Sequence, residues 1–253
     1  MRHYVLDGHT HTLGCGHAYN TLMELVNAAQ ARGLELLCLT EHGPEMPGSI
    51  SEMFFSNYRI IPPVINGVKV LKGIESNILD YTGKVDVPER LYGKLDIISA
   101  SLHEVCIQPG TKTQNTEAVL GAIDNPEVDF LCHLGNPSYP LDYETILQAA
   151  KKHNKLIEIN NASFFVRHGC KDNCVAIAKR CKELEIPVIL GTDTHFCTDV
   201  GKFPFAERCL KEADFPDELI INLEAKRLTD FLEAKGRNIL HDPREEAYAL
   251  FDE

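Results

Sequence analysis

Short apolar runs alternate along the chain with longer segments in which apolar residues recur about every 3.6 positions. There are seven such runs: Tyr4–Leu6, Leu36–Leu39, Val68–Leu71, Leu95–Ala100, Val128–Cys132, Leu156–Ile159 and Val188–Leu190. Near-continuous apolar runs are typical of strands buried on both faces, as in a parallel sheet. The alternation therefore predicts an α/β fold of seven strand–helix units, arranged in a closed or nearly closed barrel. A doubly wound open sheet is the alternative.

Three of the intervening segments have a clear helical period. The first covers residues 21–29, where Asn20 or Thr21 can cap the helix and Gly33 can end it. The other two are Tyr143–Lys152 and Cys174–Leu184. Since no Ser/Gly-rich linker or strong internal repeat interrupts the pattern, we expect one barrel domain over residues 1–240. Residues 241–253 are then a charged C-terminal tail, either on the surface or as a short helix.

Composition narrows the classes of function. A length of 253 residues suits one domain. A net charge of −12 argues against a nucleic-acid or anionic-membrane surface, but an anionic substrate stays open because a buried metal cluster supplies local positive charge. No apolar run is long enough to cross a bilayer, and no signal peptide fits before Asp7. The nine cysteines form no framework, so we expect reduced thiols and a cytoplasmic protein.

Two pairs of metal-ligand residues follow the first and last runs. His9 and His11 follow the first, and Asp193 and His195 repeat the same spacing after the last. In an extended strand, residues two apart point to the same face, so each pair can aim two side chains at one point. Imidazole and carboxylate groups are the usual ligands of zinc and related ions.

Ligand-type residues also follow the intervening runs. These are Glu41 and His42, Glu75, His103, His133, and the amides Asn160 and Asn161. Each alone has a simpler explanation, as a capping or solvated residue. Together they point to the carboxyl-terminal rim of a parallel barrel, where active sites are built. His17 lies in the loop Leu13-Gly14-Cys15-Gly16-His17, whose glycines permit a sharp return toward that rim; a ligand and a non-ligand are equally good interpretations.

Several further residues have competing interpretations. Asp7 can either orient His9 or cap the strand end. Cys15 can be a thiolate, although a reduced loop cysteine is the simpler reading, and the segment 170–174 reads as a loop that enters a helix. Arg167, after the sixth run, is a candidate for binding a substrate phosphate, and Arg59 is a weaker one. A surface salt bridge is the competing explanation for each arginine.

The ordered motifs DxHxHT, TEHG, GIE, a strand-end histidine, CHxGNP, EINN and GTDTH resemble those of the PHP (polymerase and histidinol phosphatase) family. Within it, the chain is similar to the YcdX-like phosphatases over nearly its whole length. The resemblance implies a distorted (βα)7 barrel with a trinuclear site, usually zinc. Two neighbouring positions depart from the family pattern: Glu41 stands where Asp is usual, and Leu134 where Pro is usual.

The resemblance also implies a distribution of ligands over three metal ions. The first ion would be held by His9, His11, Glu75 and Asp193. The second would share Glu75 with His103 and His133. The third would take His17, His42 and His195. Three Zn²⁺ per chain are expected, with Mn²⁺ or Fe²⁺ as alternatives.

The resulting hypothesis is a metal-dependent phosphatase that cleaves small phosphate monoesters by in-line attack of a metal-bridging hydroxide. Its catalytic set would be Glu75, Asp193 and His195, and its partner a small phosphorylated metabolite, bound with help from Arg167 or Arg59. Neither a nucleic acid nor a membrane is expected as a partner, and homo-oligomerisation stays open. The alternatives are a phosphodiesterase or other metallohydrolase, and a non-catalytic metal-binding or sensing protein. A binuclear amidohydrolase usually has a carboxylated lysine on its fourth strand, but here that strand ends in Ser101-Leu102-His103.

Overall fold

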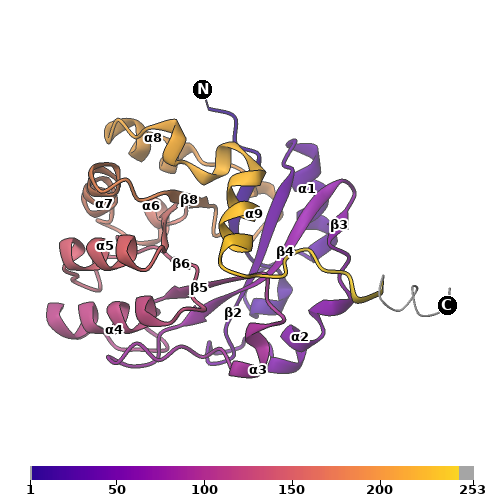
Figure 1. The fold of residues 1–253 in the computed structure, drawn as a ribbon, viewed down its shortest axis with the longest axis horizontal. Coiled ribbons are helices and arrows are strands. Elements are labelled where there is room, and N and C mark those ends of the chain that lie inside the picture. Colours follow the sequence, from indigo (N-terminus) through magenta and orange to yellow (C-terminus); the bar gives the residue numbers. More distant parts are fainter. Residues whose placement is uncertain (1, 245–253) are drawn as a thin grey trace.

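A computed structural model describes residues 2–244, which form a parallel barrel surrounded by helices (Figure 1). Seven parallel strands follow one another in chain order: β1 (Leu6–Thr10), β2 (Leu36–His42), β4 (Val68–Asn77), β5 (Ile97–Ser101), β6 (Phe130–Leu131), β7 (Leu156–Asn160) and β8 (Val188–Gly191). A short strand, β3 (Val64–Ile65), pairs antiparallel with β4. A parallel bridge between Thr10 and Thr194 joins the two ends of the sheet. The predicted, nearly closed barrel is therefore confirmed, and the open-sheet alternative is wrong.

The helices cover the outside of the barrel. The longer ones are α1 (Leu22–Ala31), α4 (Lys112–Asp124), α5 (Tyr143–Lys152), α7 (Lys171–Glu183), α8 (Pro204–Glu212) and α9 (Ala225–Ala234). Short helices are α2 (Glu52–Ser56), α3 (Glu89–Tyr92) and α6 (Ser163–Val166), and single 3-10 turns are η1 (Leu13–Cys15), η2 (Tyr58–Ile60), η3 (Cys197–Asp199), η4 (Asp217–Leu219) and η5 (Ile221–Leu223). Figure 1 shows α4, α5, α7 and α8 in a row along one side of the sheet.

Local sequence explains the helix boundaries. Thr21 and Glu24 form a reciprocal capping box at the start of α1, and Gly33, with φ 75°, follows its end. Helix α5 has the predicted bounds. Helix α7 begins at Lys171, three residues before the predicted start, so the segment after Cys170 is its first turn and not a loop. The polar residues of that turn face solvent, and the apolar period therefore starts only at Cys174.

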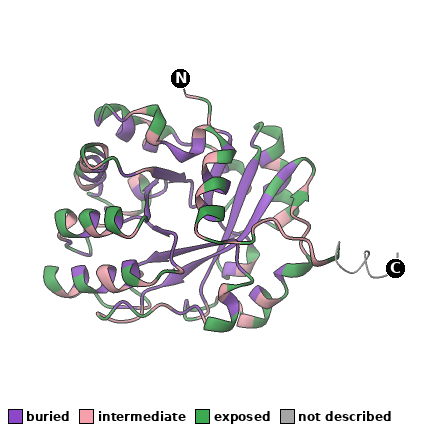
Figure 2. Ribbon diagram, viewed as in Figure 1, coloured by how far each residue is buried: buried purple, intermediate pink, exposed green. Residues whose placement is uncertain are grey.

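Strand side chains alternate between two buried layers. Along β2, Leu36 and Cys38 point into the barrel, while Leu37 and Leu39 pack against the surrounding helices. Both faces are covered, which explains the continuous apolar runs; in Figure 2 the strands are buried and the outer faces of the helices are exposed. The inner layer also contains Leu228 of α9. Since Lys235, just beyond α9, bonds to residues that precede β6, this helix covers the amino ends of the strands.

Phe130 is fully buried in the inner layer, in the same apolar cluster as Leu6 of β1 and Ile189 of β8. We expect Phe130→Ala to lower the free energy of unfolding by about 3–5 kcal/mol, through lost apolar burial and a residual cavity. Urea denaturation of the metal-free protein measures this value without a contribution from metal binding. Phe165→Ala, at a side chain that is 54% exposed, is the control and should change stability by less than about 0.5 kcal/mol. Equal losses in the two variants would contradict this packing.

Two sequence-based expectations concern the periphery. The predicted tail lies mostly outside the described residues, which include its first part, 241–244. There, Lys72 Nζ donates a hydrogen bond to the carbonyl of His241. Within residues 2–244, none of the helices combines the length and apolar character that a membrane span requires.

Candidate metal centre

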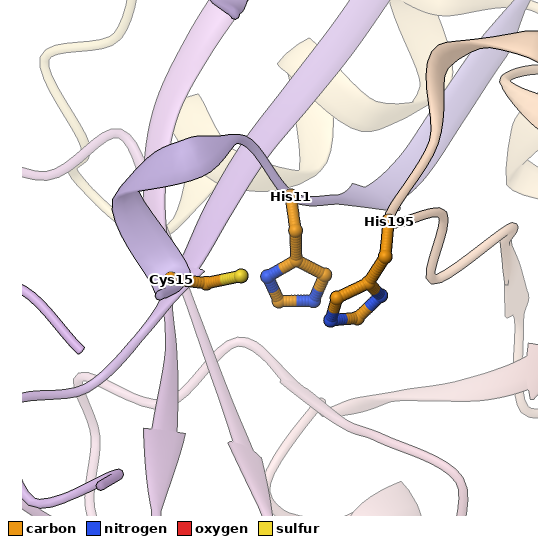
Figure 3. Close-up of side chains that lie close together, drawn as sticks. All are labelled: His11, Cys15 and His195. Atoms are coloured by element: carbon orange, nitrogen blue, oxygen red, sulfur yellow. The ribbon is translucent and has the colours of Figure 1, made fainter. Parts of the chain in front are cut away.

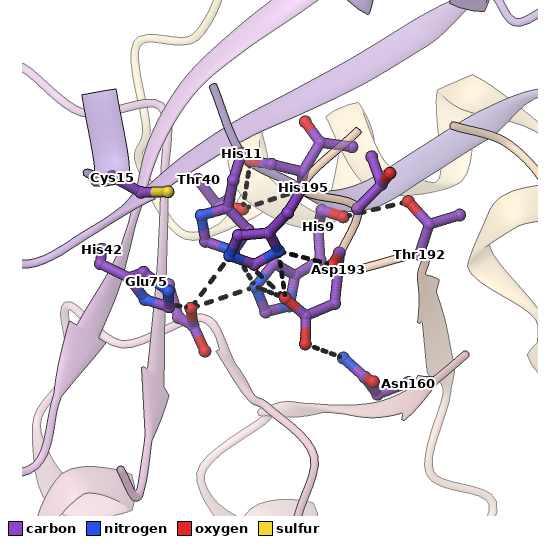
Figure 4. Close-up of polar contacts among 12 residues, drawn as sticks. His9, His11, Cys15, Thr40, His42, Glu75, Asn160, Thr192, Asp193 and His195 are labelled. Carbon is purple, nitrogen blue, oxygen red and sulfur yellow. Dashed lines mark hydrogen bonds and ion pairs between the residues drawn. The ribbon is translucent and has the colours of Figure 1, made fainter. Parts of the chain in front are cut away.

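The carboxyl ends of the strands bring all nine predicted ligands into one cluster. Figure 4 shows part of it: His9, His11, His42, Glu75, Asp193 and His195. The ligands come from β1 and its exit loop (His9, His11, His17), from β2 (His42) and β4 (Glu75), and from the segments after β5, β6 and β8 (His103, His133, Asp193, His195). Neighbouring imidazole rings lie 4.3–5.2 Å apart between centroids around this cluster. The predicted pattern of strand-end residues is therefore a real cluster in space.

Glu75 lies at the middle of the cluster and is fully buried. Its Oε2 atom is 3.2 Å from His9 Nε2, 3.4 Å from His11 Nε2 and 2.7 Å from His42 Nδ1. Its Oε1 atom is 2.8 Å from His133 Nε2 and 3.2 Å from His103 Nε2. The two oxygens thus face different sets of histidines. A carboxylate in this position is able to bridge two cations.

Asp193 completes the set formed by His9 and His11. Its Oδ1 atom is 3.3 Å from His11 Nε2 and 3.7 Å from His9 Nε2. Its Oδ2 atom accepts hydrogen bonds from Asn160 Nδ2 at 3.2 Å and from the Arg167 guanidinium at 3.3 Å. The backbone of Asp193 has φ 54°, a sparsely populated region for a residue with a side chain. Such a conformation persists where surrounding contacts hold it in place, as the hydrogen bonds to Asp193 do here.

His17 and His195 face each other at the outer side of the cluster, with their Nε2 atoms 2.9 Å apart. Each ring uses Nδ1 to donate to a backbone carbonyl, of Cys15 and of Asp193 respectively. In a neutral imidazole, this leaves a lone pair on Nε2. Gly16 permits the loop that carries His17: its φ is 84°, and an added Cβ would lie 2.1 Å from the carbonyl oxygen of Gly48. The predicted return of this loop toward the rim is therefore observed.

The unsatisfied atoms of the cluster fit bound cations. Glu75 Oε2, His42 Nδ1 and His11 Nδ1 are buried and make no hydrogen bond; the 2.7 Å contact between the first two does not have hydrogen-bond geometry. The Nε2 atoms of His9 and His11 are 3.0 Å apart, and His9 already uses Nδ1 toward Glu158. At such distances, two nitrogen lone pairs that face one another repel, and so do a nitrogen lone pair and a carboxylate oxygen. A positive charge between them removes this repulsion. The donor set of imidazole and carboxylate is the one that zinc, manganese and iron accept.

The electrostatics of His11, His133 and Glu75 agree with that fit. Burial lowers the pKa of His11 well below its usual value, and the neighbouring His42 lowers it further. Burial and the nearby Arg167 lower the pKa of His133 to about 4. Both imidazoles are therefore neutral at pH 7 and have a free lone pair. Burial alone would raise the pKa of Glu75, but His9, His42 and His103 hold it well below its usual range, so the carboxylate is ionised.

Sequence reasoning missed the residues that orient the ligands. Glu158 is buried in β7; its Oε1 accepts from His9 Nδ1 at 2.7 Å, and its Oε2 accepts from the backbone N–H of His133 at 2.8 Å. Asn77 Oδ1 accepts from His103 Nδ1 at 2.7 Å. The signal for Glu158 was present, because it is a charged residue within the apolar run Leu156–Ile159. Orienting partners of this kind fix the tautomer and direction of a ligating imidazole.

Asp7 does not have the orienting role that was one of its two interpretations. Its carboxylate accepts from Thr192 Oγ1 and from the backbone N–H groups of Thr192 and Gly201, and from His9 only through the backbone. Asp7 therefore ties β1 to the loop after β8 and makes no contact with the His9 imidazole. Asp7 lies two residues before His9, and its carboxylate is already used by hydrogen bonds to the segment after β8.

Three neighbouring positions complete the description. Glu41, one departure from the family pattern, accepts from Thr12 and lies 4.0 Å from His11 Nδ1; burial raises its pKa to about 7. Leu134, the other departure, is buried in the outer apolar layer. Cys15 Sγ lies among the nitrogens of His11 and His195, within 4.8 Å (Figure 3). Burial raises the pKa of the Cys15 thiol to about 11, so it is not a thiolate at neutral pH.

A cavity of about 810 Å³ opens over the cluster and is lined by His17, His42, His103, Asp193, His195 and Arg167, among others. Arg59 does not line it. This residue lies in η2 and borders a separate cavity of about 460 Å³ with Gly93, Lys94 and Asp96, which precede β5. The structure therefore places Arg59 away from the cluster, which does not support its predicted role in binding substrate there. The chain between β2 and β4 returns to the amino end of the barrel and carries Arg59 with it.

A parallel barrel with a histidine-rich cluster at its carboxyl rim defines a class of metal-binding barrel proteins. The model of the PHP domain family matches residues 7–162, and this chain belongs to that family. A protein of Caldicellulosiruptor saccharolyticus named "Probable phosphatase" is 46% identical over 234 residues, which is 92% of this chain and 98% of that protein. A "Probable phosphatase" of Clostridium botulinum is 45% identical and covers 92% of this chain and 96% of its own length.

Solved structures with the same fold are more distant in sequence. Histidinol phosphate phosphatase of Lactococcus lactis, complexed with zinc, L-histidinol and phosphate, aligns with a TM-score of 0.56 and 19% identity, over 84% of this chain and 95% of the other. A chain from the structure of archaeal ribonuclease P with mature tRNA has a TM-score of 0.56 and 15% identity, over 91% of this chain and 90% of the other. At such identities the likeness shows the fold alone.

Proposed function

We propose that this protein is a metal-dependent phosphatase that hydrolyses small phosphate monoesters. The observation that carries the proposal is the buried Glu75 carboxylate, which has histidines on both oxygens and an Oε2 atom without a hydrogen-bond partner. The names of the relatives at 45–46% identity support phosphatase chemistry, and the zinc and phosphate in the Lactococcus structure support the metal and the ligand class.

Three ions, most simply Zn²⁺, would be held by the three sets that share this cluster. His9, His11 and Asp193 form one set with Glu75, and His103 and His133 form a second on the other oxygen of Glu75. The third consists of His17, His42 and His195. When bound, such ions supply a nucleophile at neutral pH and stabilise negative charge on a phosphoryl group. Their combined charge exceeds that of Glu75 and Asp193, which favours a monoester dianion as the ligand.

The chain's own residues prepare this site in two ways. Glu158 and Asn77 hold the imidazoles of His9 and His103 in one tautomer, with Nε2 directed toward Glu75. Asp193 and His195 lie both in the cluster and in the wall of the cavity, and are therefore the residues, with Glu75, that we assign to the reacting centre. Arg167 lies beside them and is half-buried, with its guanidinium on Asp193 Oδ2 and Ser163 Oγ.

We expect Arg167→Ala to lower kcat/KM by roughly 10–100-fold, mainly through KM, because a hydrogen bond to a charged group contributes about 1.5–3 kcal/mol. A guanidinium has five donors, so the contacts to Asp193 and Ser163 leave some for a phosphate. Initial rates over a range of substrate concentrations measure the effect. Arg180→Ala is the control, since Arg180 pairs with Glu144 on the surface. Unchanged kinetics in Arg167→Ala would remove this residue from the binding site.

The test of the proposal uses two substrates with the same leaving group. The zinc-loaded protein is assayed with 4-nitrophenyl phosphate and with bis(4-nitrophenyl) phosphate, before and after treatment with a chelator. The expected result is chelator-sensitive hydrolysis of the monoester and little hydrolysis of the diester. Faster turnover of the diester would favour a phosphodiesterase, and no turnover of either would favour a non-catalytic metal-binding protein.

A further inference from the structure

Exposed apolar side chains gather around the mouth of the cavity over the candidate metal centre. Among residues 2–244, eleven large hydrophobic side chains are exposed, and five of them line this cavity. These five, which we call the apolar rim, are Tyr19, Val105, Phe165, Val166 and Phe196. They come from four segments, after β1, β5, β7 and β8, and Phe165 and Val166 lie in the short helix α6. Exposed apolar side chains that gather in one patch often mark a binding site, whereas scattered ones are normal on a protein surface.

Aromatic groups extend from the rim into the wall. The ring of Phe165 lies 6.2 Å from that of Phe205, with an angle of 49° between their planes, and Phe205 also lines the cavity. Phe205 in turn stacks on Phe164 at 6.1 Å. One wall is therefore an aromatic surface backed by a second ring. Such a surface favours a flat apolar ligand, which gains from both burial and ring contacts.

The polar side chains of the same cavity are mostly occupied by the protein itself. Asn161 Oδ1 accepts from the backbone N–H groups of Phe205 and Ala206. Thr194 Oγ1 donates to the carbonyl of Phe196, and Thr192 Oγ1 donates to Asp7. A ligand rich in hydroxyl groups would find few free partners here. A site discriminates strongly in favour of such groups only when it offers them hydrogen bonds.

The charged side chains near the rim do not favour a second anionic group. Lys202 pairs with Asp199 at 3.4 Å, and Glu104 adds an exposed carboxylate to the lining. A bisphosphate or a phosphorylated acid would bring its second negative charge close to Glu104. The site therefore suits one phosphate on an uncharged body.

We propose that the substrate is a phosphate monoester of an aromatic or similarly flat apolar alcohol, whose body lies against the apolar rim while its phosphate lies at the metal centre. This inference rests on the proposed phosphatase function and adds the substrate class to it. A cavity of about 810 Å³ accommodates a ring system in addition to the phosphate. Phe165 and Phe196 are the specificity-determining residues in this account.

The first experiment measures binding without catalysis. The affinities of the zinc-loaded protein for benzylphosphonate and methylphosphonate, which share the phosphonate group, are compared by calorimetry. We expect benzylphosphonate to bind at least about 10-fold more tightly, as burial of an aromatic ring against an apolar wall implies. Phe165→Ala and Phe196→Ala should each lose most of that difference and keep the affinity for methylphosphonate. Ile60→Ala, at a residue that is 61% exposed and outside the cavity lining, is the matched control.

The second experiment measures kinetics with 1-naphthyl phosphate, glycerol 1-phosphate and glucose 6-phosphate. The expected result is a kcat/KM for the naphthyl ester about 10-fold or more above the others, and a rise in KM for that ester alone in the two rim variants. Equal or better turnover of the sugar phosphate would overturn the inference. It would also be overturned if the two rim variants changed the oligomeric state of the protein and left the KM for the naphthyl ester unchanged. If no monoester is hydrolysed, the proposed function fails, whereas a retained preference for benzylphosphonate would still support the rim.

Discussion

Glu75→Gln is expected to lower kcat/KM by roughly 10³-fold, because metal-ion stabilisation of a phosphoryl group contributes several kcal/mol and about 4 kcal/mol corresponds to that factor. The Glu75 oxygens face His9, His11 and His42 on one side and His103 and His133 on the other. An amide would remove the negative charge between the two proposed cations in a buried site, so their mutual repulsion would no longer be compensated. We therefore expect both ions to be held more weakly.

His17→Ala is the comparison that makes this result specific. His17 is exposed, lies on the η1 loop and makes its close ligand-type contact with His195. Its loss should affect the third ion and leave the pair around Glu75, so measurable turnover should remain. Metal content, circular dichroism and kcat are measured for the two variants together. Both should keep the wild-type fold, since the apolar layers do not include the ligands. A Glu75→Gln protein that retains its metals and most of its activity would show that Glu75 is not a bridge.

The second large effect is expected at Glu158, which was not among the predicted ligands. Glu158→Gln should weaken metal binding by about 10–100-fold, the usual consequence of losing a carboxylate that orients a ligating histidine. The carboxylate holds the His9 ring through Nδ1 and the backbone of His133 through its other oxygen. Titration with zinc against a competing chelator measures the affinity, and excess zinc should restore much of the lost activity.

Glu41→Gln is a matched control for this variant. Glu41 is also a buried carboxylate near the cluster, but it bonds to Thr12 and comes no closer than 4.0 Å to His11 Nδ1. Burial raises its pKa to about 7, so glutamine resembles its protonated form closely. Its metal affinity should stay within a few-fold of wild type. If both glutamine variants bind zinc equally weakly, loss of buried charge in general explains the result, and the specific orienting role of Glu158 is wrong.

Apolar periodicity was sufficient to predict the barrel, and the residue types at the strand ends were sufficient to predict the cluster. The seven apolar runs became the seven parallel strands, because strands covered on both faces have no polar alternation to obscure them. The cluster of candidate ligands followed, since carboxyl ends of parallel strands converge on the barrel axis. Even His17, whose interpretation was evenly balanced, lies 2.9 Å from His195 between the Nε2 atoms.

The sequence pattern could not predict contacts between segments that are distant along the chain. Glu158 orients His9 across 149 positions, and nothing near either residue specifies that contact. Arg59 was expected at the cluster because its type suits a phosphate, but the path of the β2–β4 connection takes it to the other end of the barrel. The apolar rim is equally non-local, since its five members come from four separate segments of the chain. Sequence spacing within one element carries no information about such convergence.

The central claim, a multinuclear metal site that hydrolyses phosphate monoesters, is tested most directly by one titration. Protein freed of metal with a chelator is given increasing equivalents of zinc, and hydrolysis of 4-nitrophenyl phosphate is recorded beside the zinc bound per chain. We predict no activity in the metal-free protein, a rise that continues beyond the first equivalent, and saturation at about three ions, as nine ligands exceed the needs of one four-coordinate ion. Full activity at one equivalent, or activity that persists in the chelated protein, would contradict the account.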